Sequence, residues 1–318
     1  MKSFFKSEIS RPERPGLLSS DRLPSTIRYM ASRVPPGTRL KPRTDQSASS
    51  GTVTEQWLES EPDPAFARRA RIILNNLKIK GKEKVLDVGC GRGFYLKLLS
   101  QRRTRTEIIG LDVRRSYLTR AKERGNRAHV IQADAASLPF RSKSVDQILA
   151  SEILEHVEAD EKVIAEIHRT LRPKGKAIFS VPNRKYPFLW DPLNWMLERV
   201  FKKHIPSHIW WLAGIWADHR RLYDEHELRE KLEKAGLKTE KVWKTTRWCF
   251  PFSHFLLYGI GKNVVERGWG KNFNRFIRKE KPSWTNNIVL WPLRIIDKLN
   301  QNQDKDPSVN IIAKVIKI

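Results

Sequence analysis

Three aspartates stand at or near the ends of three short apolar runs, and this spacing could place three carboxylates around one ligand. Asp87 lies in residues 85–93, Asp112 ends residues 108–112, and Asp134 ends residues 130–134. Each run has the length and composition of a buried strand. Ligands of an open parallel sheet bind outside the carboxyl ends of its strands. We therefore expect Asp87, Asp112 and Asp134 to gather along one edge of a sheet.

A glycine-rich loop follows the first of these runs. Gly89, Gly91 and Gly93 alternate with other residues, and a helix is predicted to begin near Phe94. Glycine lets the backbone approach a ligand closely, and the free N–H groups of the following helix face whatever the loop holds. A dinucleotide site would favour Gly-x-Gly-x-x-Gly with no carboxylate at the loop entrance. The loop therefore predicts a nucleotide-like cofactor without a pyrophosphate.

S-adenosylmethionine matches this pattern because it carries an ammonium group, a ribose diol and a sulfonium but no phosphate. The chain resembles the class I S-adenosylmethionine-dependent methyltransferases of the type 11 kind, and the resemblance covers residues 85–183. Residues 85–93 resemble the first motif of that family, residues 110–112 the second strand end, residues 151–157 the exit of the fourth strand, and residues 171–176 the turn before the fifth.

The resemblance implies a role for each of these positions. The glycine loop would line the methionine end of S-adenosylmethionine, Asp112 would hold the ribose hydroxyls, and Asp134 with the Ala135 backbone would contact the adenine. The implied cofactor-binding residues are Asp87, Gly89, Gly91, Gly93, Asp112, Asp134, Ala135 and Ser151. The alternative for a single strand-end aspartate is a turn-forming or helix-capping role.

The elements that must position these residues alternate between strand and helix from Lys84 onward, which predicts an α/β fold with a parallel sheet. Asp63-Pro64 starts a helix over residues 63–77 that we expect to cover the first strand, and further helices are predicted near residues 159–171 and 224–236. Later strands are predicted at residues 177–181, 239–245 and 309–318. The resemblance implies a Rossmann-like sheet of seven strands, six parallel and one antiparallel, with helices on both faces.

Two long segments do not belong to this sheet pattern. We predict a methyltransferase core of residues 53–182, 224–246 and 308–318, a disordered basic arm at residues 1–52, and substrate-side insertions at residues 183–223 and 247–307 that form a lid. Most of the 11 Trp residues fall in these insertions, including the adjacent Trp210 and Trp211, of which we expect at least one to face outward. Interleaved Lys and Arg suggest an apolar pocket with a basic rim. The alternative is that the Trp side chains build the core of a helical cap.

The charge balance predicts an anionic partner. The chain has 61 Lys and Arg against 35 Asp and Glu, a net charge of +26. An acidic lipid surface or nucleic acid would suit this charge, and a role in solubility alone is the alternative. The two cysteines form no disulfide framework, no secretory leader is visible, and no apolar run is long enough to span a bilayer. We expect a cytoplasmic protein that is peripheral at a membrane surface, and we predict no oligomeric state.

Two histidines are candidates for the catalytic base that a hydroxyl acceptor needs. His156 follows the fourth strand, and His219 begins residues 219–223, which resemble a His-x-Arg-x-aromatic stretch of methyltransferases in lipid, quinone and glycan pathways. Either histidine could instead be structural. Glu152, Glu155 and His156 also resemble a Glu-x-x-Glu-His cluster that holds a divalent ion in some quinone-ring and small-RNA O-methyltransferases. Because relatives carry similar residues without a metal, no metal ligand is predicted.

These features predict an S-adenosylmethionine-dependent methyltransferase that acts on a hydroxyl or another nucleophile of a lipid-like, quinone-like or lipid-linked glycan substrate. One alternative is an RNA methyltransferase of the ribose 2′-O type, since basic and aromatic residues also bind single strands. Base N-methylation is disfavoured because residues 151–154 lack an Asn/Asp-Pro-Pro-aromatic turn. A second alternative is a non-catalytic protein that binds the cofactor or a membrane surface.

Overall fold

The structure is a computed structural model in which residues 55, 57–59, 61–102, 104–125, 127–209, 212–256, 291–292, 295–301 and 304–318 are described. The chain divides into two compact units, Met1–Thr44 and Asp45–Ile318, and every described residue belongs to the second. The predicted basic arm, the Trp210–Trp211 pair, Trp269 and Trp284 lie outside the described residues.

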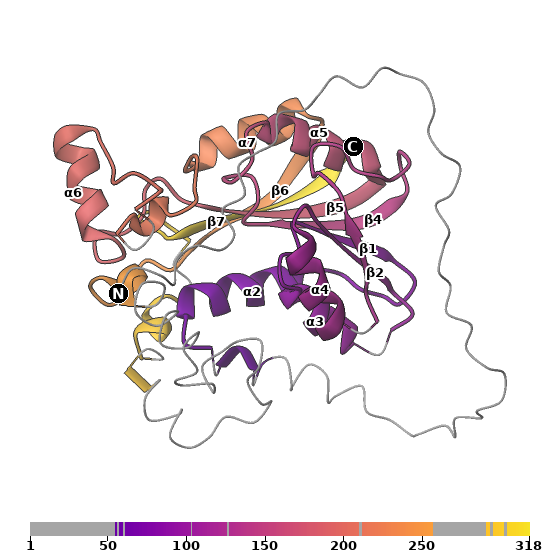
Figure 1. The fold of residues 1–318 in the computed structure, drawn as a ribbon, viewed down its shortest axis with the longest axis horizontal. Helices are drawn as coiled ribbons and strands as arrows, with labels where there is room; N and C mark the ends of the chain where they lie inside the picture. The colour runs from indigo at the N-terminus through magenta and orange to yellow at the C-terminus, as the bar shows by residue number, and fades with distance from the viewer. Residues whose placement is uncertain are drawn as a thin grey trace, which may run out of the picture. The chain divides into compact units, whose positions relative to one another are not determined.

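A seven-stranded sheet forms the centre of the described unit (Figure 1). Its order is β3-β2-β1-β4-β5-β7-β6, and β7 runs antiparallel to both β5 and β6, whereas the other neighbouring strands are parallel. The strands are β1 (Lys84–Val88), β2 (Glu107–Asp112), β3 (His129–Gln132), β4 (Val145–Ser151), β5 (Leu171–Pro182), β6 (Leu237–Thr245) and β7 (Asn310–Lys317). This arrangement confirms the predicted fold class of six parallel strands and one antiparallel strand.

Helices cover both faces of the sheet, and each face has its own hydrophobic core. On one face, side chains of α2 (Pro64–Asn76), α3 (Phe94–Ser100) and α4 (Arg115–Arg124) are buried together. On the other face, α5 (Asp160–Thr170) and α7 (Glu225–Lys234) supply the buried side chains. The central strands are buried on both sides, and for this reason β1 and β4 read as nearly continuous apolar runs.

The helix starts are fixed by capping residues that the sequence already displays. The Asp63 side chain accepts a hydrogen bond from the Phe66 N–H at 3.0 Å, and Pro64 occupies the first turn of α2. The Asp224 side chain accepts from the Glu227 N–H at 2.9 Å at the start of α7. Both starts agree with the predicted positions.

The placement of α2 differs from the prediction. The sequence suggested that this helix covers the first strand, but α2 packs chiefly against β5, β6 and β7. The last strand, β7, enters the sheet between β5 and β6, and α2 covers one face of this half of the sheet. Burial of Ile178 and Ile312 in the core that includes α2 shows that α2 supplies that cover.

The first insertion contains α6 (Pro192–Phe201) and a 3₁₀ turn, η1 (Gly214–Trp216). A small core of its own forms around Tyr186, Trp190 and Ile215, with Trp195 and Trp216 packed against it. Trp190 is therefore a core residue of the first insertion, as the alternative interpretation of the Trp residues predicted. Among the described residues, no helix is long and apolar enough to cross a membrane.

Candidate functional site

The carboxyl ends of the four central strands lie at one edge of the sheet. Val88 at the end of β1 is in register with Leu111 of β2 and with Ala150 of β4, and Leu111 is in register with Ile131 of β3. The three predicted acidic positions are thereby brought to the same rim. The Gly91 N–H donates to Oδ2 of Asp112 at 2.9 Å, so the glycine loop and the second carboxylate are in direct contact.

The glycine loop crosses this rim between β1 and α3. The Gly89 N–H donates to the Leu111 carbonyl at 2.8 Å, which holds the start of the loop against β2. Gly93 has a φ of +80°, and a Cβ there would lie 2.7 Å from the Ala121 Cα, so backbone packing requires glycine. Gly91 has a φ of +52°, but a Cβ there would meet nothing within 4 Å. The open side of Gly91 is therefore the part of the loop where a ligand can approach.

Asp112 and Asp134 are both held by turns at the strand ends. The Arg114 N–H donates to Oδ1 of Asp112 at 2.8 Å, and the Ala136 N–H donates to Oδ1 of Asp134 at 2.8 Å. Asp134 is exposed and Ala135 is buried. Val113 directly follows Asp112 and is 64% exposed, which gives the rim an apolar surface on which a flat ring can pack. Val113 was not predicted as a site residue, although an apolar residue directly after a strand-end aspartate could have indicated it.

Asp87 is the buried member of the acidic set. Burial raises the pKa of the Asp87 carboxyl well above its ordinary value, and the charge of Asp112 raises it further. Its Oδ2 atom has no hydrogen-bond partner among the described residues. A buried polar atom without a partner is rare and costly, and a cationic group would satisfy it. The methionine ammonium of S-adenosylmethionine has the charge and donors that Asp87 needs, so these residues fit that cofactor.

A chain of polar side chains supports the rim beneath β4. The Tyr95 hydroxyl lies 3.4 Å from the Ser151 Oγ, which lies 2.8 Å from the Ser180 Oγ. Ser180 donates to Glu152 at 3.1 Å, and Glu152 forms an ion pair with Arg69 of α2 at 2.7 Å. Ser151, predicted as a cofactor-binding residue, therefore lies in a network that fixes Glu152. No sequence pattern singled out Arg69, because its partner Glu152 is distant along the chain.

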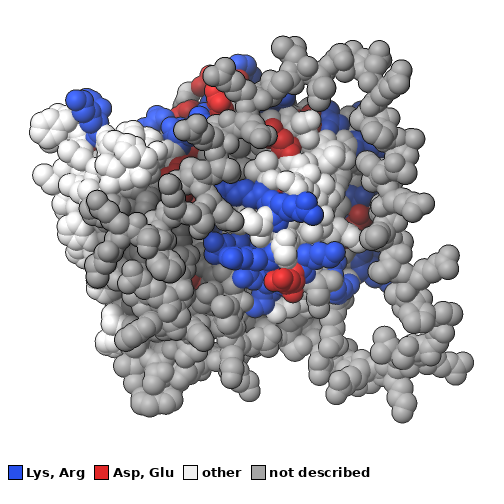
Figure 2. Space-filling view, in the orientation of Figure 1, with Lys and Arg blue, Asp and Glu red and all other residues white. Residues whose placement is uncertain are grey.

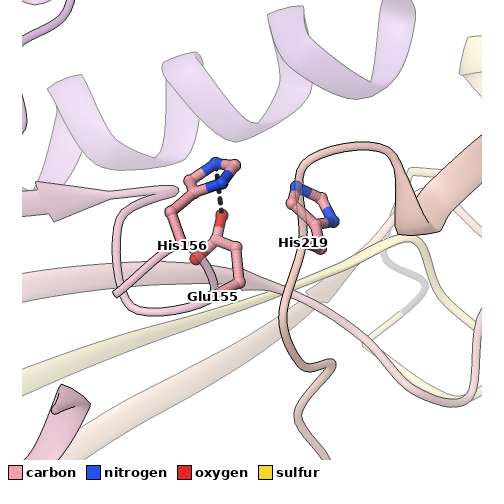
Figure 3. A group of neighbouring side chains, drawn as sticks. All are labelled: Glu155, His156 and His219. Atoms are coloured by element: carbon pink, nitrogen blue, oxygen red, sulfur yellow. Dashed lines mark ion pairs between the residues drawn. The ribbon is translucent and has the colours of Figure 1, made fainter. Parts of the chain in front are cut away.

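Glu155, His156 and His219 form a cluster just beyond β4 (Figure 3). One ligand-type atom of each lies within 4.8 Å of the others, and the two imidazole rings are 4.8 Å apart. His156 Nε2 lies 3.9 Å from Oε1 of Glu155. Both candidate bases are thus neighbours, although they come from different parts of the chain.

The cluster combines two buried groups with one accessible imidazole. Burial raises the pKa of the Glu155 carboxyl well above its ordinary value, and the charge of Glu152 adds to the shift. Burial, together with the nearby His156, lowers the pKa of His219 to about 3. Within the described part of the chain, both Glu155 oxygens and the His219 Nδ1 lack hydrogen-bond partners. These unpartnered atoms point to a ligand that is not a protein side chain.

His156 is oriented so that one nitrogen is free to accept a proton. Its Nδ1 lies 2.9 Å from the Asp218 carbonyl oxygen, which can only accept, so Nδ1 carries the hydrogen in the neutral ring. The lone pair is then on Nε2. The side chain is 40% exposed, so an acceptor molecule can reach it.

The residues around His219 are structural anchors. The Arg220 N–H donates to the Glu155 carbonyl at 2.9 Å, which joins the two segments directly. The Tyr223 hydroxyl donates to Asp160 at 2.7 Å, and Arg221 pairs with the same carboxylate at 2.7 Å. The residues of the 219–223 stretch other than the histidine therefore hold His219 against the loop after β4.

The three clustered residues form a donor set that could hold a divalent cation. The set differs from the Glu-x-x-Glu-His pattern of the sequence, because the Glu152 carboxylate is bound by Arg69 and Ser180, whereas His219 joins Glu155 and His156. The sequence could not supply His219 as a partner, since 63 positions separate it from His156.

An apolar cavity of about 180 Å³ lies between the start of α2 and residues 246–256, and none of the three clustered residues lines it. Ser253 lies on its wall, and the neighbouring His254 is close enough to His219 to lower the pKa of His219 further. The lining residues include Pro64, Ala65, Trp190, Trp248, Phe250, Leu256 and Ile296. A wider cavity of about 590 Å³ contains Arg68, Arg71 and Asp297, but none of the predicted site residues lines it.

Comparison with known proteins identifies similar sequences and folds. A family model described as a methyltransferase domain matches residues 86–179. A probable S-adenosylmethionine-dependent methyltransferase of Mycolicibacterium smegmatis is 30% identical over 63% of this chain and 66% of that protein. A ubiquinone biosynthesis O-methyltransferase of Aliivibrio fischeri is 28% identical over 62% of this chain and 80% of that protein. Other curated relatives are matched over only about half of their length.

Among solved structures, a methyltransferase of Thermotoga maritima, titled a possible histamine N-methyltransferase, matches with a TM-score of 0.49 and 16% identity. The match covers 84% of this chain and 92% of that chain.

Proposed function

Because this chain belongs to the class I S-adenosylmethionine-dependent methyltransferases, we propose that it transfers a methyl group to a hydroxyl of a lipid-like acceptor, such as a quinone-like or lipid-linked glycan molecule. The observation that carries the proposal is the Glu155, His156 and His219 cluster, which lies just beyond the end of β4 at the cofactor rim.

The cofactor end of the site requires binding and orientation. Asp87 would pair with the methionine ammonium, Asp112 would accept from the ribose hydroxyls, and Asp134 with the Ala135 backbone would contact the adenine. The sulfonium is an activated methyl donor, so the protein must chiefly align the acceptor oxygen, the methyl carbon and the sulfur. A rigid rim made of parallel strand ends is suited to this alignment.

The acceptor end requires removal of a proton. His156 is the proposed base, because its Nε2 lone pair is free and its side chain is accessible. His219 packs against His156 and is held neutral by burial, so it does not add a positive charge that would oppose protonation of His156. His156 would take the proton of the acceptor hydroxyl on Nε2, and bound S-adenosylmethionine would supply the methyl group with its thioether as the leaving group.

The same cluster offers a second way to activate the hydroxyl. Glu155, His156 and His219 would be the ligands of a divalent cation, and such an ion would supply charge that lowers the pKa of an acceptor hydroxyl. In that case the buried Glu155 carboxyl would be ionised and its unpartnered oxygens satisfied.

The lipid-like acceptor is inferred from the lid. An apolar cavity of about 180 Å³ is smaller than a drug-sized site, so it suits one segment of an acyl or isoprenoid chain. The ubiquinone O-methyltransferase relative is named for a reaction on a molecule of this class. The net charge of +26 also suits an acceptor presented at an anionic membrane surface.

Labelled S-adenosylmethionine tests the proposal. The purified full-length protein is incubated with a fractionated cell extract, and the label is expected in the organic phase that contains lipids. His156→Gln should lower the transfer rate by roughly 100-fold, because general-base catalysis contributes about that much. His226→Gln is the matched control, since His226 is an exposed residue of α7 whose side chain is 90% accessible.

Three outcomes would contradict the proposal. Label in the RNA phase would indicate the RNA methyltransferase alternative, and cofactor binding without any transfer would indicate a non-catalytic protein. Equal transfer rates for His156→Gln and the control would show that His156 is not the catalytic base. A parallel reaction with a chelator separates the two modes of activation: loss of rate that added Mg²⁺ restores indicates a cation, and an unchanged rate indicates His156 as the base.

A further inference from the structure

Helix α6 presents two faces with different partners. Its inward face is tied to the lid: Asn194 is fully buried and donates to Asp191 at 2.8 Å, and Glu198 accepts from the Tyr186 hydroxyl at 3.0 Å. The Trp216 indole N–H also donates to Glu198. In Figure 1, α6 lies at the outer end of the molecule, away from the sheet. The helix is therefore firmly held on one side and open on the other.

The open face of α6 is a continuous apolar stripe. Leu193, Met196 and Val200 are spaced three and four residues apart, which places them on one side of a helix, and Phe201 extends the stripe. All four are exposed, Val200 by 66% and Phe201 by 64%. Phe188, just before α6, is also exposed and packs edge-on against Trp195 of that helix. An exposed apolar surface that is held in a fixed conformation marks a binding site.

Positive charge borders this stripe. Arg199 and, just after the helix, Lys202 and Lys203 are exposed. Glu198 is the one acidic residue of α6, and it is bound to Tyr186 and Trp216 on the inward face. In Figure 2 the left edge of the molecule, where α6 lies, shows white atoms with blue Lys or Arg side chains at its upper end and no red. The open face of α6 thus combines apolar and cationic groups without an exposed acid of its own.

We infer that α6 docks on an anionic lipid bilayer, with its apolar stripe in the interface and its cations against the headgroups. An interfacial helix needs a row of apolar side chains with cations at its border, and α6 has both. A protein partner would require acidic residues to match Arg199, Lys202 and Lys203, whereas an acidic leaflet supplies that charge everywhere.

Docking through α6 would place the apolar cavity next to the bilayer. Trp190 lies two residues before α6 and lines that cavity, and Asp191 caps the helix by accepting from the Asn194 N–H at 3.1 Å. A lipid acceptor could then pass from the membrane into the lid without crossing water. This consequence rests on the proposed function, whereas the docking itself does not.

Co-sedimentation with vesicles tests the inference. Full-length protein is mixed with phosphatidylcholine vesicles that contain or lack phosphatidylglycerol, and the bound fraction is measured at low and at high salt. The wild type is expected to bind the anionic vesicles. Val200→Ser/Phe201→Ser should lower the partition coefficient at least tenfold at both salt concentrations, because two apolar side chains no longer enter the interface.

Two further variants complete the design. Ile318→Ser is the matched control, because Ile318 is 85% exposed at the end of β7 and lies at the sheet edge opposite the cofactor rim. It should bind vesicles as the wild type does. Lys202→Ala/Lys203→Ala should weaken binding at low salt and leave the high-salt value unchanged, because salt screens the electrostatic part of the binding.

The outcomes separate this inference from the proposed function. If Val200→Ser/Phe201→Ser binds anionic vesicles as strongly as the wild type, the inference is overturned. It is also overturned if the wild type does not bind anionic vesicles; dissociation of a wild-type dimer by the same substitutions would then show that this face contacts a second copy of the chain. If the inference holds, Val200→Ser/Phe201→Ser loses vesicle binding but binds S-adenosylmethionine with the affinity of the wild type, which shows that the variant is folded. A failure to transfer methyl groups would contradict only the proposed function, since vesicle binding needs no turnover.

Discussion

Gly91 and Gly93 stand two residues apart in the same loop, yet a methyl group added to each meets different surroundings. At Gly93 it collides with the backbone of Ala121, and at Gly91 it enters open space. Both residues have positive φ, so both substitutions carry backbone strain. The difference between them separates the role of the loop in folding from its role in binding.

Gly91→Ala is expected to weaken binding of S-adenosylmethionine by at least tenfold, since the new methyl group lies where the ligand approaches. Its free energy of unfolding should fall by only about 1 kcal/mol, the cost of the left-handed conformation. Gly93→Ala should lower the free energy of unfolding by about 3 kcal/mol, because steric overlap adds to the strain. Calorimetric titration and chemical denaturation measure the two effects, and equal affinity of Gly91→Ala and the wild type would place the cofactor elsewhere.

At the scale of the elements, one buried carboxylate joins α5, α7 and the segment that carries His219. Asp160 accepts from Lys231 of α7 at 2.6 Å and from the Tyr223 hydroxyl at 2.7 Å, and it pairs with Arg221. Although burial alone would raise the pKa of Asp160, the bonds from Lys231, Tyr223 and Arg221 lower it overall. The position of His219 therefore depends on an ionised Asp160.

Asp160→Asn should lower the free energy of unfolding by about 2 kcal/mol, because hydrogen bonds to a charged group contribute about that much. Glu230→Gln on α7 is the matched control, since Glu230 is 72% exposed and should change stability by less than about 0.5 kcal/mol. Chemical denaturation at neutral pH measures both. A loss in Asp160→Asn no larger than in the control would show that the Asp160 contacts are energetically neutral.

Acid should remove the contribution of Asp160. Its folded-state pKa is lowered, so between that pKa and the unfolded value of about 3.9 the unfolded chain binds more protons than the folded one. The stabilisation is present above the unfolded pKa and is lost as the pH falls through the folded pKa. The stability difference between the wild type and Asp160→Asn is expected to shrink below about pH 4. A difference that stays constant with pH would contradict the ionised role.

At the scale of the whole molecule, the site is assembled from segments that lie far apart in sequence. The rim comes from β1 to β4, the base cluster joins the loop after β4 to residue 219, and Arg69 of α2 reaches Glu152. Ligands that bind the folded state alone stabilise all of these parts together. Cofactor binding should therefore be visible in global unfolding.

S-adenosylmethionine at about 100 times its dissociation constant is expected to raise the free energy of unfolding by about 2.7 kcal/mol. The reason is mass action, because the unfolded chain has no rim to bind it. Thermal unfolding with and without the cofactor measures the effect, and Gly91→Ala should show a smaller rise at the same concentration. An identical unfolding curve with and without the cofactor would contradict the assigned binding site.

Short-range patterns were sufficient for most strands and helices and for the placement of the strand-end carboxylates. Apolar runs ending in Asp87 and Asp112 predicted β1 and β2, and Asp63 and Asp224 predicted two helix starts, because strand periodicity and helix capping act within a few residues. The gathering of Asp87, Asp112 and Asp134 at one rim could be predicted for the same reason, and their binding of the cofactor stays a prediction. The predicted position of α2 was wrong, because the strands that α2 covers depend on where β7 enters the sheet.

The sequence by itself determined an α/β alternation with acidic groups at strand ends around a glycine loop, because those signals are local, and the resemblance to a family supplied the number of strands. Only the tertiary structure decided that His219 lies beside Glu155 and His156, that Arg69 holds Glu152, and that the apolar side chains of α6 are exposed. Each of these depends on packing between distant segments. A local sequence pattern does not show which distant segments contact each other in the folded chain. Those contacts assemble the residues on the acceptor side of the site.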